Sequence, residues 1–506
     1  MTVYIDGENL TIEEVHRVSR NHEEVKMAEV CREKIEISRD VVEDKLDGEE
    51  DVYGINTGFG DLANVKIEKE KTEDLQKNLI RSHSSGVGDL LDKDVVRGTM
   101  LLRANTLAKG YSGIRMKVIS LLIDMLNEGV HPVIPSQGSV GASGDLAPLA
   151  HMSLVLMGEG EAFYEGERLS GEKALVSADL EPIELKAKEG LALVNGTQIM
   201  TAIGALTVHD GKRLLKAAQI AGAMSLEALK GTDAVFDDRI HQIRPHQGQI
   251  DCADNLNRLT SDSEIIESHK DCDKVQDPYT LRCMPQVYGA TKDALSYVED
   301  ILNTEMNSAT DNPLVFPDGD VISGGNFHGQ PIALSLDYLA SALSEIGDIS
   351  ERTTDKLMYK EESGLPRFLS ENEGLNSGFM IAQYTAASLV SENKVLSHPA
   401  SVDSIPTSAG QEDHVSMGSI SARQAKEVLE NVENVVAIEM MSAAQGLEYH
   451  DKIPGKGVKV AYDHIRERVD PLEKDRPLSG DIKSIKDSFK AGDLIEKVED
   501  AVGTLK

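Results

Sequence analysis

The chain has 506 residues, of which 40% are hydrophobic, so it can bury a large core and is expected to be globular. Its 86 acidic and 52 basic residues give a net charge of −34, which excludes nucleic acid and anionic membranes as partners because both would repel it. The acidity leaves two explanations open, a solubilising surface or adaptation to a saline host. Only 4% of residues are aromatic and none is Trp, so the core must be mainly aliphatic, which favours packed helices.

The N-terminal residues 1–15 contain neither a basic segment nor an apolar one, so no signal peptide is predicted. No stretch reaches about 18 uninterrupted apolar residues, so we expect no membrane span. Four cysteines show neither CxxC spacing nor the pattern of a small secreted domain: Cys31, Cys252, Cys272 and Cys283. These features predict reduced thiols in a cytoplasmic protein.

Helical periodicity dominates the chain. Apolar residues recur at steps of three and four within residues 114–125, and Gly129 ends that stretch. Residues 203–229 are rich in Ala, Gly and Leu, which suits a helix buried on most sides. The three-and-four spacing returns within residues 336–346 and 428–439. The sequence therefore predicts a mainly α protein built around a bundle of long helices.

Strand signals are few, and the segments 51–62 and 319–329 are expected to be loops or short hairpins with Gly at their turns. We expect three parts of one catalytic unit. Residues 1–200 form a smaller region that carries active-site loops, residues 201–450 form the long-helix bundle, and residues 451–506 form a charged, solvent-facing helical segment.

Polar clusters lie between the periodic stretches, in loops punctuated by Gly and Pro. Reactive side chains on loops that a rigid scaffold positions are typical of functional sites. The loops are residues 53–60, 81–88, 138–148, 194–198, 276–288, 305–313, 324–331 and 404–418.

The stretch Gly138–Ala150, GSVGASGDLAPLA, is too small and too rich in Gly for an ordinary helix or strand. Ser143 lacks the G-x-S-x-G spacing of a hydrolase nucleophile, and no Lys follows as in a phosphate-binding loop. A plain turn is the simplest interpretation. The alternative is chemistry of the backbone itself, in which the amide nitrogen of Gly144 closes a ring on the carbonyl carbon of Ala142. Loss of water, including the Ser143 hydroxyl, would then leave an electrophilic methylidene group.

These thirteen residues resemble the signature of the aromatic amino acid ammonia-lyases, and the resemblance runs from about residue 45 to about residue 450. That family carries a 4-methylidene-imidazol-5-one (MIO) group. The resemblance implies that MIO forms autocatalytically from Ala142, Ser143 and Gly144, without an external cofactor. It also implies a homotetramer whose active sites are shared between three subunits, with MIO near helix N-termini.

The resemblance assigns roles to further residues. Tyr53 is expected to remove the substrate β-proton, as a tyrosinate whose pKa nearby positive groups lower. Asn195 is expected to hydrogen-bond the MIO carbonyl. Tyr279 resembles a second essential tyrosine, contributed by a neighbouring subunit. The expected substrate-binding residues are His83, Gln276, Arg282, Phe327 and Glu412.

Two of these positions bear on the substrate. A carboxylate such as Glu412 can pair with an imidazole, whereas beside a phenyl ring it would lose water without compensation. The His83–Ser84 pair is typical of members that act on histidine. Arg282 suits a substrate carboxylate because its planar fork can bind in a bidentate manner. The predicted reaction is therefore non-oxidative deamination of L-histidine to trans-urocanate and ammonia.

Alternatives stay open at this point. A tyrosine or phenylalanine ammonia-lyase, or an aminomutase, would use the same MIO group, and a non-catalytic helical scaffold would leave Ser143 unmodified. His241 and His246 are five positions apart with no third ligand in view, so no metal is expected.

Overall fold

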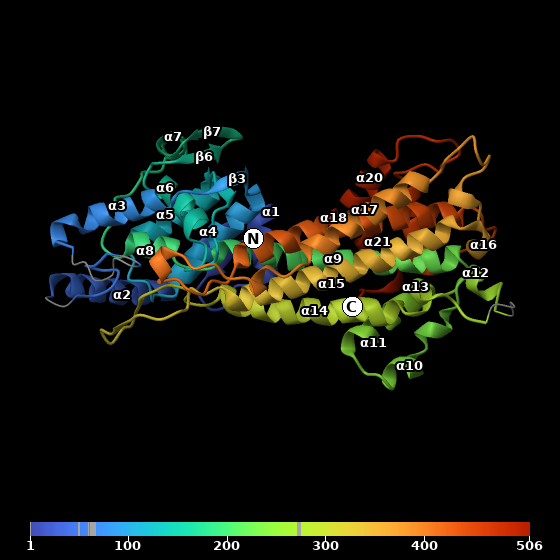
Figure 1. Ribbon diagram of the computed structural model, residues 1–506, viewed down its shortest axis with the longest axis horizontal. Coiled ribbons are helices and arrows are strands. Elements are labelled where there is room, and N and C mark those ends of the chain that lie inside the picture. The colour runs from blue at the N-terminus through green and yellow to red at the C-terminus, as the bar shows by residue number, and fades with distance from the viewer. Residues whose placement is uncertain (1, 49–50, 59, 61–66, 271–274) are drawn as a thin grey trace. The chain divides into compact units, whose positions relative to one another are not determined.

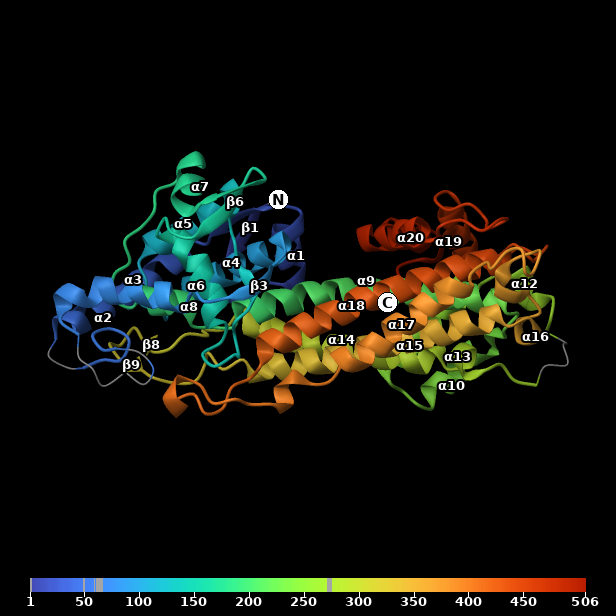
Figure 2. The ribbon, with the colours of Figure 1, turned by 45° about the horizontal axis from the view of Figure 1, so that its top comes forward.

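The structure is a computed structural model that describes residues 2–48, 51–58, 60, 67–270 and 275–506. It is mainly helical (Figures 1 and 2), which confirms the predicted fold class. The chain forms two compact units made of interleaved segments. Unit 1 comprises Met1–His209, Val298–Asp337 and Pro399–Arg423, and unit 2 comprises Asp210–Tyr297, Tyr338–His398 and Gln424–Lys506.

Four long helices contain boundaries between the units: α9 (Gln198–Ala228), α14 (Met284–Met306), α15 (Gln330–Met358) and α18 (Gly418–Leu447). Of the periodic stretches in the sequence, residues 203–229 fall almost entirely in α9, residues 336–346 in α15 and residues 428–439 in α18. The expected boundary at residues 200/201 falls within α9, and the one at 450/451 lies between α18 and the next helix. The division into three sequential parts stays a prediction.

Unit 1 holds the described strands and eight of the shorter helices. Its helices are α1 (Ile12–Arg20), α2 (Val30–Asp47), α3 (Thr72–His83), α4 (Lys93–Ala108), α5 (Met116–Glu128), α6 (Leu146–Leu156), α7 (Gly171–Ser177) and α8 (Glu189–Val194). Its strands are β1 (Thr2–Ile5), β2 (Glu24–Met27), β3 (Val87–Leu90), β4 (His131–Pro132), β5 (Pro135–Gln137), β6 (Glu161–Tyr164), β7 (Glu167–Ser170), β8 (Leu314–Val315) and β9 (Val321–Ile322).

These strands form small sheets only. β1 pairs with β2 in parallel, β3 pairs with β5 and β8 with β9 in antiparallel, and β4, β6 and β7 form a three-stranded sheet. Of the β8–β9 pair, β9 lies within the predicted segment 319–329 and β8 precedes it. Residues 59 and 61–62 of the other predicted segment lie outside the described residues.

Local signals set the helix ends as the sequence predicts. α5 ends at Gly129, whose φ of +80° is the left-handed conformation that favours Gly after a helix. α1 begins with a capping box, in which Thr11 accepts a hydrogen bond from the Glu14 backbone and the Glu14 side chain accepts one from the Thr11 backbone. α4 is buried all round from Val95 to Ala108, so it forms a core element of unit 1.

Unit 2 contains the remaining parts of the long helices, and α14, α15, α17 (Met380–Leu396) and α18 run side by side in both views (Figures 1 and 2). Small residues permit this packing, because a side chain at Gly211 or Gly347 would crowd leucine and valine side chains of the neighbouring helices. The shorter helices of unit 2 are α10 (Asp238–Gln242), α11 (Gln247–Leu259), α12 (Glu264–Glu267), α13 (Tyr279–Arg282), α16 (Lys360–Ser363), α19 (Lys456–Arg466), α20 (Ser479–Ala491) and α21 (Asp493–Val502).

The C-terminal segment is helical as predicted, but it is not merely solvent-facing. Val458, Phe489 and Val498 are fully buried, so α19, α20 and α21 each place an apolar face in the core of unit 2. The prediction of a solvent-facing segment rested on its charge content, which does not show the apolar residues that recur every three or four positions in these helices. Among the described residues, no helix is both long and apolar enough to cross a membrane.

Candidate active site

A cavity of about 530 Å³ in unit 1 gathers most of the predicted site residues that belong to this unit. Its lining includes Tyr53, Ala142, Ser143, Asn195, Phe327 and Glu412, all of which the sequence analysis singled out. It also includes Gly60, Asn312, Ser323, Gly324, His328, Gln411, Asp413 and His414. Loops from five separate parts of the sequence therefore meet at one place.

The Ala142–Ser143–Gly144 segment is tightly packed against the neighbouring backbone. Gly144 has a φ of +76°, and a Cβ added there would lie 2.0 Å from the carbonyl oxygen of Gly196, so only Gly fits. The two glycines form an isolated parallel bridge, in which the Gly196 N–H donates to the Ser143 carbonyl (3.2 Å) and the Asp145 N–H donates to the Gly196 carbonyl (2.7 Å). This pairing holds the backbone on both sides of Ser143.

Two serines fix the rest of the turn. The Ser139 hydroxyl donates to the Gly144 carbonyl (3.1 Å) and accepts from the Gly141 N–H (3.1 Å), while the Ser416 hydroxyl donates to the Gly141 carbonyl (3.2 Å). Ala142 packs with Val415 and Met417 in a small apolar cluster. Among the hydrogen bonds of the described residues, none uses the Gly144 N–H, which is the nitrogen that ring closure requires.

Asp145 ties this turn to the ends of other helices. It precedes α6, is fully buried, and accepts through Oδ2 from the backbone N–H groups of Ile199 and Met200 in the first turn of α9. Ser419, in the first turn of α18, donates its hydroxyl to Oδ1 at 2.7 Å. Burial raises the pKa of Asp145 to about 6, although these hydrogen bonds act in the other direction. The N-terminal ends of three helices thus converge next to Ser143, and their partial positive charge suits an electrophilic centre.

The Asn195 side chain is part of a buried polar network. Its Nδ2 donates to the Asn312 carbonyl (2.8 Å) and lies 3.5 Å from Asp311 Oδ1. Asp311 in turn pairs with Lys188 at 2.7 Å, and both side chains are completely buried. Arg103, also buried, donates to the backbone carbonyl of Asn195. The network fixes the orientation of the amide, whose predicted contact with the MIO carbonyl stays a prediction.

Tyr53 differs from expectation in its electrostatics. Its hydroxyl accepts from the Gly60 N–H at 3.4 Å. Burial raises the pKa of Tyr53, and the carboxylates of Glu412 and Asp311 raise it further. These effects run opposite to the lowered pKa that the sequence analysis expected for this tyrosine.

Glu412 and His83 lie close enough to influence each other. Burial lowers the pKa of His83, while the Leu79 backbone and the Glu412 carboxylate act in the opposite direction. Thr407 donates its hydroxyl to Glu412 Oε2 at 2.7 Å, which holds the carboxylate in place. His83 is the last residue of α3 and does not line the cavity itself.

Three predicted residues belong to unit 2 and do not line this cavity. Gln276 and Tyr279 are exposed, with Tyr279 at 72%, and the Arg282 guanidinium lies 4.6 Å from the centre of the Tyr279 ring. Arg282 Nε is buried without a hydrogen-bond partner. Their predicted roles as residues shared between subunits stay predictions.

Sequence reasoning missed the buried residues behind the cavity. Asp145 follows directly after the Ala-Ser-Gly motif, and Asp311 and Asn312 lie in a polar loop that was noted without a role. Lys188 and Arg103 gave no signal, because one is in an ordinary charged stretch and the other is in a buried helix. Their function follows from three-dimensional pairing alone.

Histidine clusters elsewhere in unit 1 and unit 2 have structural partners. His241 is buried, with Nε2 3.1 Å from the Val235 carbonyl and Nδ1 3.0 Å from Gln249 Nε2. Among the described residues, Glu13, His16 and His209 are near enough to one another to suggest a metal site. However, the two imidazoles stack at 3.8 Å with an angle of 12°, so one ion could not lie in the planes of both rings.

Residues 10–467 match the aromatic amino acid lyase family, and the chain belongs to this family. The family inferred from Gly138–Ala150 is thereby confirmed.

Among its full-length relatives, the chain is similar to the histidine ammonia-lyase of Alkaliphilus oremlandii (57% identity over 502 residues, 99% of each chain). It is also similar to that of Caldanaerobacter subterraneus subsp. tengcongensis (56% over 500 residues, 98% of each chain). The crystal structure of histidine ammonia-lyase from Trypanosoma cruzi aligns with a TM-score of 0.92 at 42% identity, covering 99% of this chain and 96% of that one. Tyrosine aminomutase from Streptomyces globisporus aligns with a TM-score of 0.95 at 37% identity over the whole of both chains.

Proposed function

We propose that this protein is a histidine ammonia-lyase that converts L-histidine to trans-urocanate and ammonia, the first step of histidine degradation. The observation that carries the proposal is the cavity that combines Ser143, Asn195 and Tyr53 with the carboxylate of Glu412. Full-length relatives at 51–57% identity that bear this name support it.

The Ala142–Ser143–Gly144 segment suits formation of MIO. Gly144 fits where any Cβ would clash, its N–H is not engaged by a described hydrogen bond, and Ser143 borders the cavity. The MIO group would supply an electrophilic carbon for the substrate amine, which makes the nitrogen a better leaving group. The Asn195 amide and the three helix N-termini would stabilise negative charge on this side of the cavity.

Tyr53 is the proposed base for the β-proton of the substrate. A tyrosine whose pKa is raised is mostly protonated at neutral pH, and a cation near its hydroxyl in the assembled site would favour the tyrosinate that acts as the base. We propose that neighbouring subunits supply this cation with Arg282, which also binds the substrate carboxylate, and that Tyr279 and Gln276 enter the site with it. The close contact between Arg282 and Tyr279 supports their action as one group.

We propose that Glu412 and His83 recognise the imidazole ring of the substrate. An ionised Glu412, held by Thr407, can accept an imidazole N–H, and Phe327 offers an apolar face beside it. A phenyl or phenol ring would leave the Glu412 carboxylate without a partner, which disfavours phenylalanine and tyrosine.

Assembly as a homotetramer is part of this proposal. Unit 2 exposes large apolar side chains on its long helices, and such patches mark protein–protein contacts. They are Tyr297 (54% exposed), Tyr338 (49%), Ile381 (56%), Tyr384 (61%) and Val395 (72%). The free thiols of Cys31, Cys252 and Cys283 support a reducing location, which we propose is the cytoplasm.

The decisive experiment combines the intact mass of the purified protein with the ultraviolet absorbance of urocanate formed from L-histidine. The wild type should weigh two water molecules less than its sequence and produce urocanate. Ser143→Ala should show the full sequence mass for its composition and lose activity by a factor on the order of a thousand or more. An unshifted wild-type mass, or no urocanate from a dehydrated protein, would overturn the proposal.

The choice of substrate is tested separately with Glu412→Gln. Loss of a charge-assisted hydrogen bond should lower kcat/KM for histidine by about 10- to 100-fold while the dehydration seen by mass stays complete. Product analysis with histidine, tyrosine and phenylalanine distinguishes the alternatives. Formation of a β-amino acid from tyrosine would instead point to an aminomutase.

A further inference from the structure

Unit 1 contains a second cavity, of about 550 Å³, that shares no lining residue with the candidate active site. It lies among α4, α5, β4 and β6, beside the end of β3. Much of its lining is apolar: Leu90, Leu91, Val96, Val133, Ile134 and Phe163. A cavity of this size and lining is typical of sites for small organic molecules, which usually have a few polar groups that fix the ligand.

The cavity is backed by a buried cation. Arg97 is 2% exposed, and its described hydrogen bonds go to the backbone carbonyls of Val18 and Leu126 and to His131 Nε2 (3.0 Å). All of these acceptors are neutral. A guanidinium keeps its charge when buried, so a positive charge remains behind the cavity wall without a carboxylate among its hydrogen-bond partners.

His131 carries this polarity into the cavity lining. Because its Nε2 accepts from the Arg97 guanidinium, the neutral ring must hold its proton on Nδ1. Burial, together with Arg97, Lys93 and His22, lowers the pKa of His131 to about 3, so the ring stays neutral. His131 therefore provides a fixed N–H donor rather than a titrating group.

Two more basic groups line the same cavity. Burial and the neighbouring Arg97 lower the pKa of Lys93, and burial, Arg97 and Lys93 lower that of His22. Glu128 and Glu165 are exposed lining residues, yet no carboxylate of the described chain contributes to the pKa of either basic group. Lys93 and the buried Arg97 thus lie beside a mainly apolar lining, and the two lining carboxylates, Glu128 and Glu165, are exposed.

We propose that this cavity is a binding site for a small amphipathic carboxylate, whose hydrocarbon body fills the apolar lining and whose head group lies against Lys93 and the His131 N–H. An anion there neutralises the positive charge of Arg97 and Lys93, which a neutral or cationic ligand cannot do. The site is independent of the proposed catalytic reaction, because none of its residues lines the active-site cavity.

Calorimetric titration of the full-length protein with three probes of equal chain length tests the proposal. The probes are octanoate, octyltrimethylammonium and octyl glucoside. Octanoate should bind at a single site and weaken as salt is added, and the other two probes should bind at least about tenfold more weakly. Equal binding of all three probes, or no binding of octanoate, would overturn the proposal.

Matched lysine variants locate the site. Lys93 is exposed and is the first residue of α4, where a Glu is favourable to the helix, so Lys93→Glu is expected to fold. It should weaken octanoate binding by about tenfold or more without changing the rate of urocanate formation. Lys117→Glu, an equally exposed site in the first turn of α5, should bind octanoate like the wild type. Equal loss in both variants, or no loss in Lys93→Glu, would contradict the assignment.

Discussion

Unit 1 and unit 2 both bury ionisable groups completely, but they satisfy them in different ways. Next to the active-site cavity of unit 1, Lys188 and Asp311 form an ion pair, and Arg103 acts on the nearby carboxylates of Asp311 and Asp145. In unit 2, Glu439 receives hydrogen bonds only from the hydroxyls of Ser225 (2.9 Å) and Ser350 (2.6 Å). The described partners of Glu439 include no cation.

The two arrangements have different consequences for charge. Burial raises the pKa of Glu439 to about 8, and it raises the pKa of Glu227 to about 8 as well, so both are neutral acids around neutral pH. Asp145 in unit 1 has a pKa of about 6 and is mostly ionised there. The buried carboxyl beside the active-site cavity is thus ionised, whereas Glu439 and Glu227 in unit 2 are uncharged hydrogen-bonding groups.

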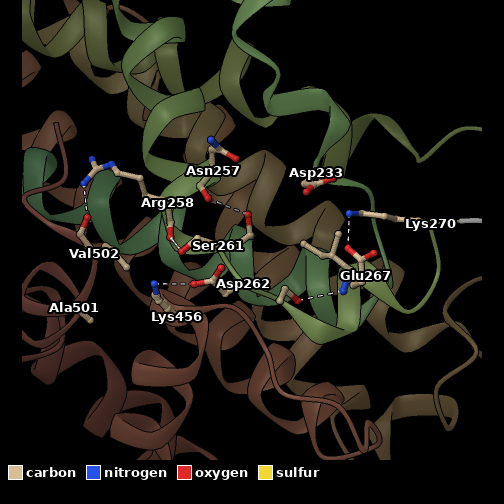
Figure 3. A pocket seen from close by; sticks show the side chains of 13 residues that line it. Asp233, Asn257, Arg258, Ser261, Asp262, Glu267, Lys270, Lys456, Ala501 and Val502 are labelled. Atoms are coloured by element: carbon tan, nitrogen blue, oxygen red, sulfur yellow. Dashed lines mark hydrogen bonds and ion pairs between the residues drawn. The ribbon is translucent and has the colours of Figure 1, made fainter.

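A polar cavity in unit 2 shows how this unit arranges its exposed charges. The cavity has a volume of about 570 Å³ and is lined by both acidic and basic side chains. Figure 3 shows that Lys456 points toward Asp262 and that Lys270 points toward Glu267. These pairs are exposed and satisfied within the chain, so they contribute little to stability. In these examples from unit 2 the exposed charges form ion pairs, whereas the buried carboxyl of Glu439 is neutral.

The largest effect is expected where a charge of unit 1 loses its partner. Lys188→Met keeps the side-chain length but leaves Asp311 buried without its cation. Breaking a buried pair in this way costs about 3–5 kcal/mol in the free energy of unfolding. Because Asp311 lies beside the Asn195 amide, dehydration of Ser143 should also become incomplete. Urea unfolding and intact mass measure the two effects.

The control is the double variant Lys188→Met with Asp311→Leu, which removes both charges. It should recover a large part of the lost stability, since no unpaired charge remains. If the single variant were as stable as the wild type, the Lys188–Asp311 ion pair would not stabilise the active-site region.

The next effect concerns the acids of unit 2 and is read as a pH dependence. The folded pKa of Glu439, about 8, lies above its ordinary value of 4.5, so its contribution to stability is fully present below about pH 4.5 and is lost as pH rises through about 8. In this window the free energy of unfolding should fall by about 1 kcal/mol per pH unit because of this group. Glu439→Gln should remove that slope, as shown by urea unfolding at a series of pH values.

A matched variant in unit 1 sharpens the result. Asp311→Asn breaks the buried ion pair with Lys188, so it should lower the free energy of unfolding. An unchanged slope in Glu439→Gln would show that this carboxyl is ionised in the folded protein.

Much of the architecture could be predicted because the signals are local. The three-and-four spacing of residues 336–346 and 428–439 predicted the long helices α15 and α18, and Gly129 marked the end of α5. The Ala-Ser-Gly motif pointed to the family, which the comparisons confirm. These features depend on neighbours along the chain, which a single sequence shows directly.

The buried pairing behind the site could not be predicted, because it joins residues far apart in sequence. Lys188 and Asp311 are 123 positions apart, and Asp145 reaches Ser419 over 274 positions. The direction of the Tyr53 pKa also differed from expectation, since burial and the carboxylates of Glu412 and Asp311 raise it. The interleaved units likewise follow from contacts across the chain rather than from composition.

The smallest effect compares one hydroxyl in each unit. Ser419 donates to Asp145 at 2.7 Å and Ser350 donates to Glu439 at 2.6 Å, and both serines are buried. At about pH 7, Asp145 is ionised and Glu439 is protonated, so Ser419→Ala should cost about 1.5–3 kcal/mol and Ser350→Ala about 1 kcal/mol. At about pH 5 both acceptors are neutral, and the two costs should become equal within about 0.5 kcal/mol. Urea unfolding of both variants at the two pH values measures these costs. If the two costs differed by the same amount at both pH values, the charge of Asp145 would not be what distinguishes the units.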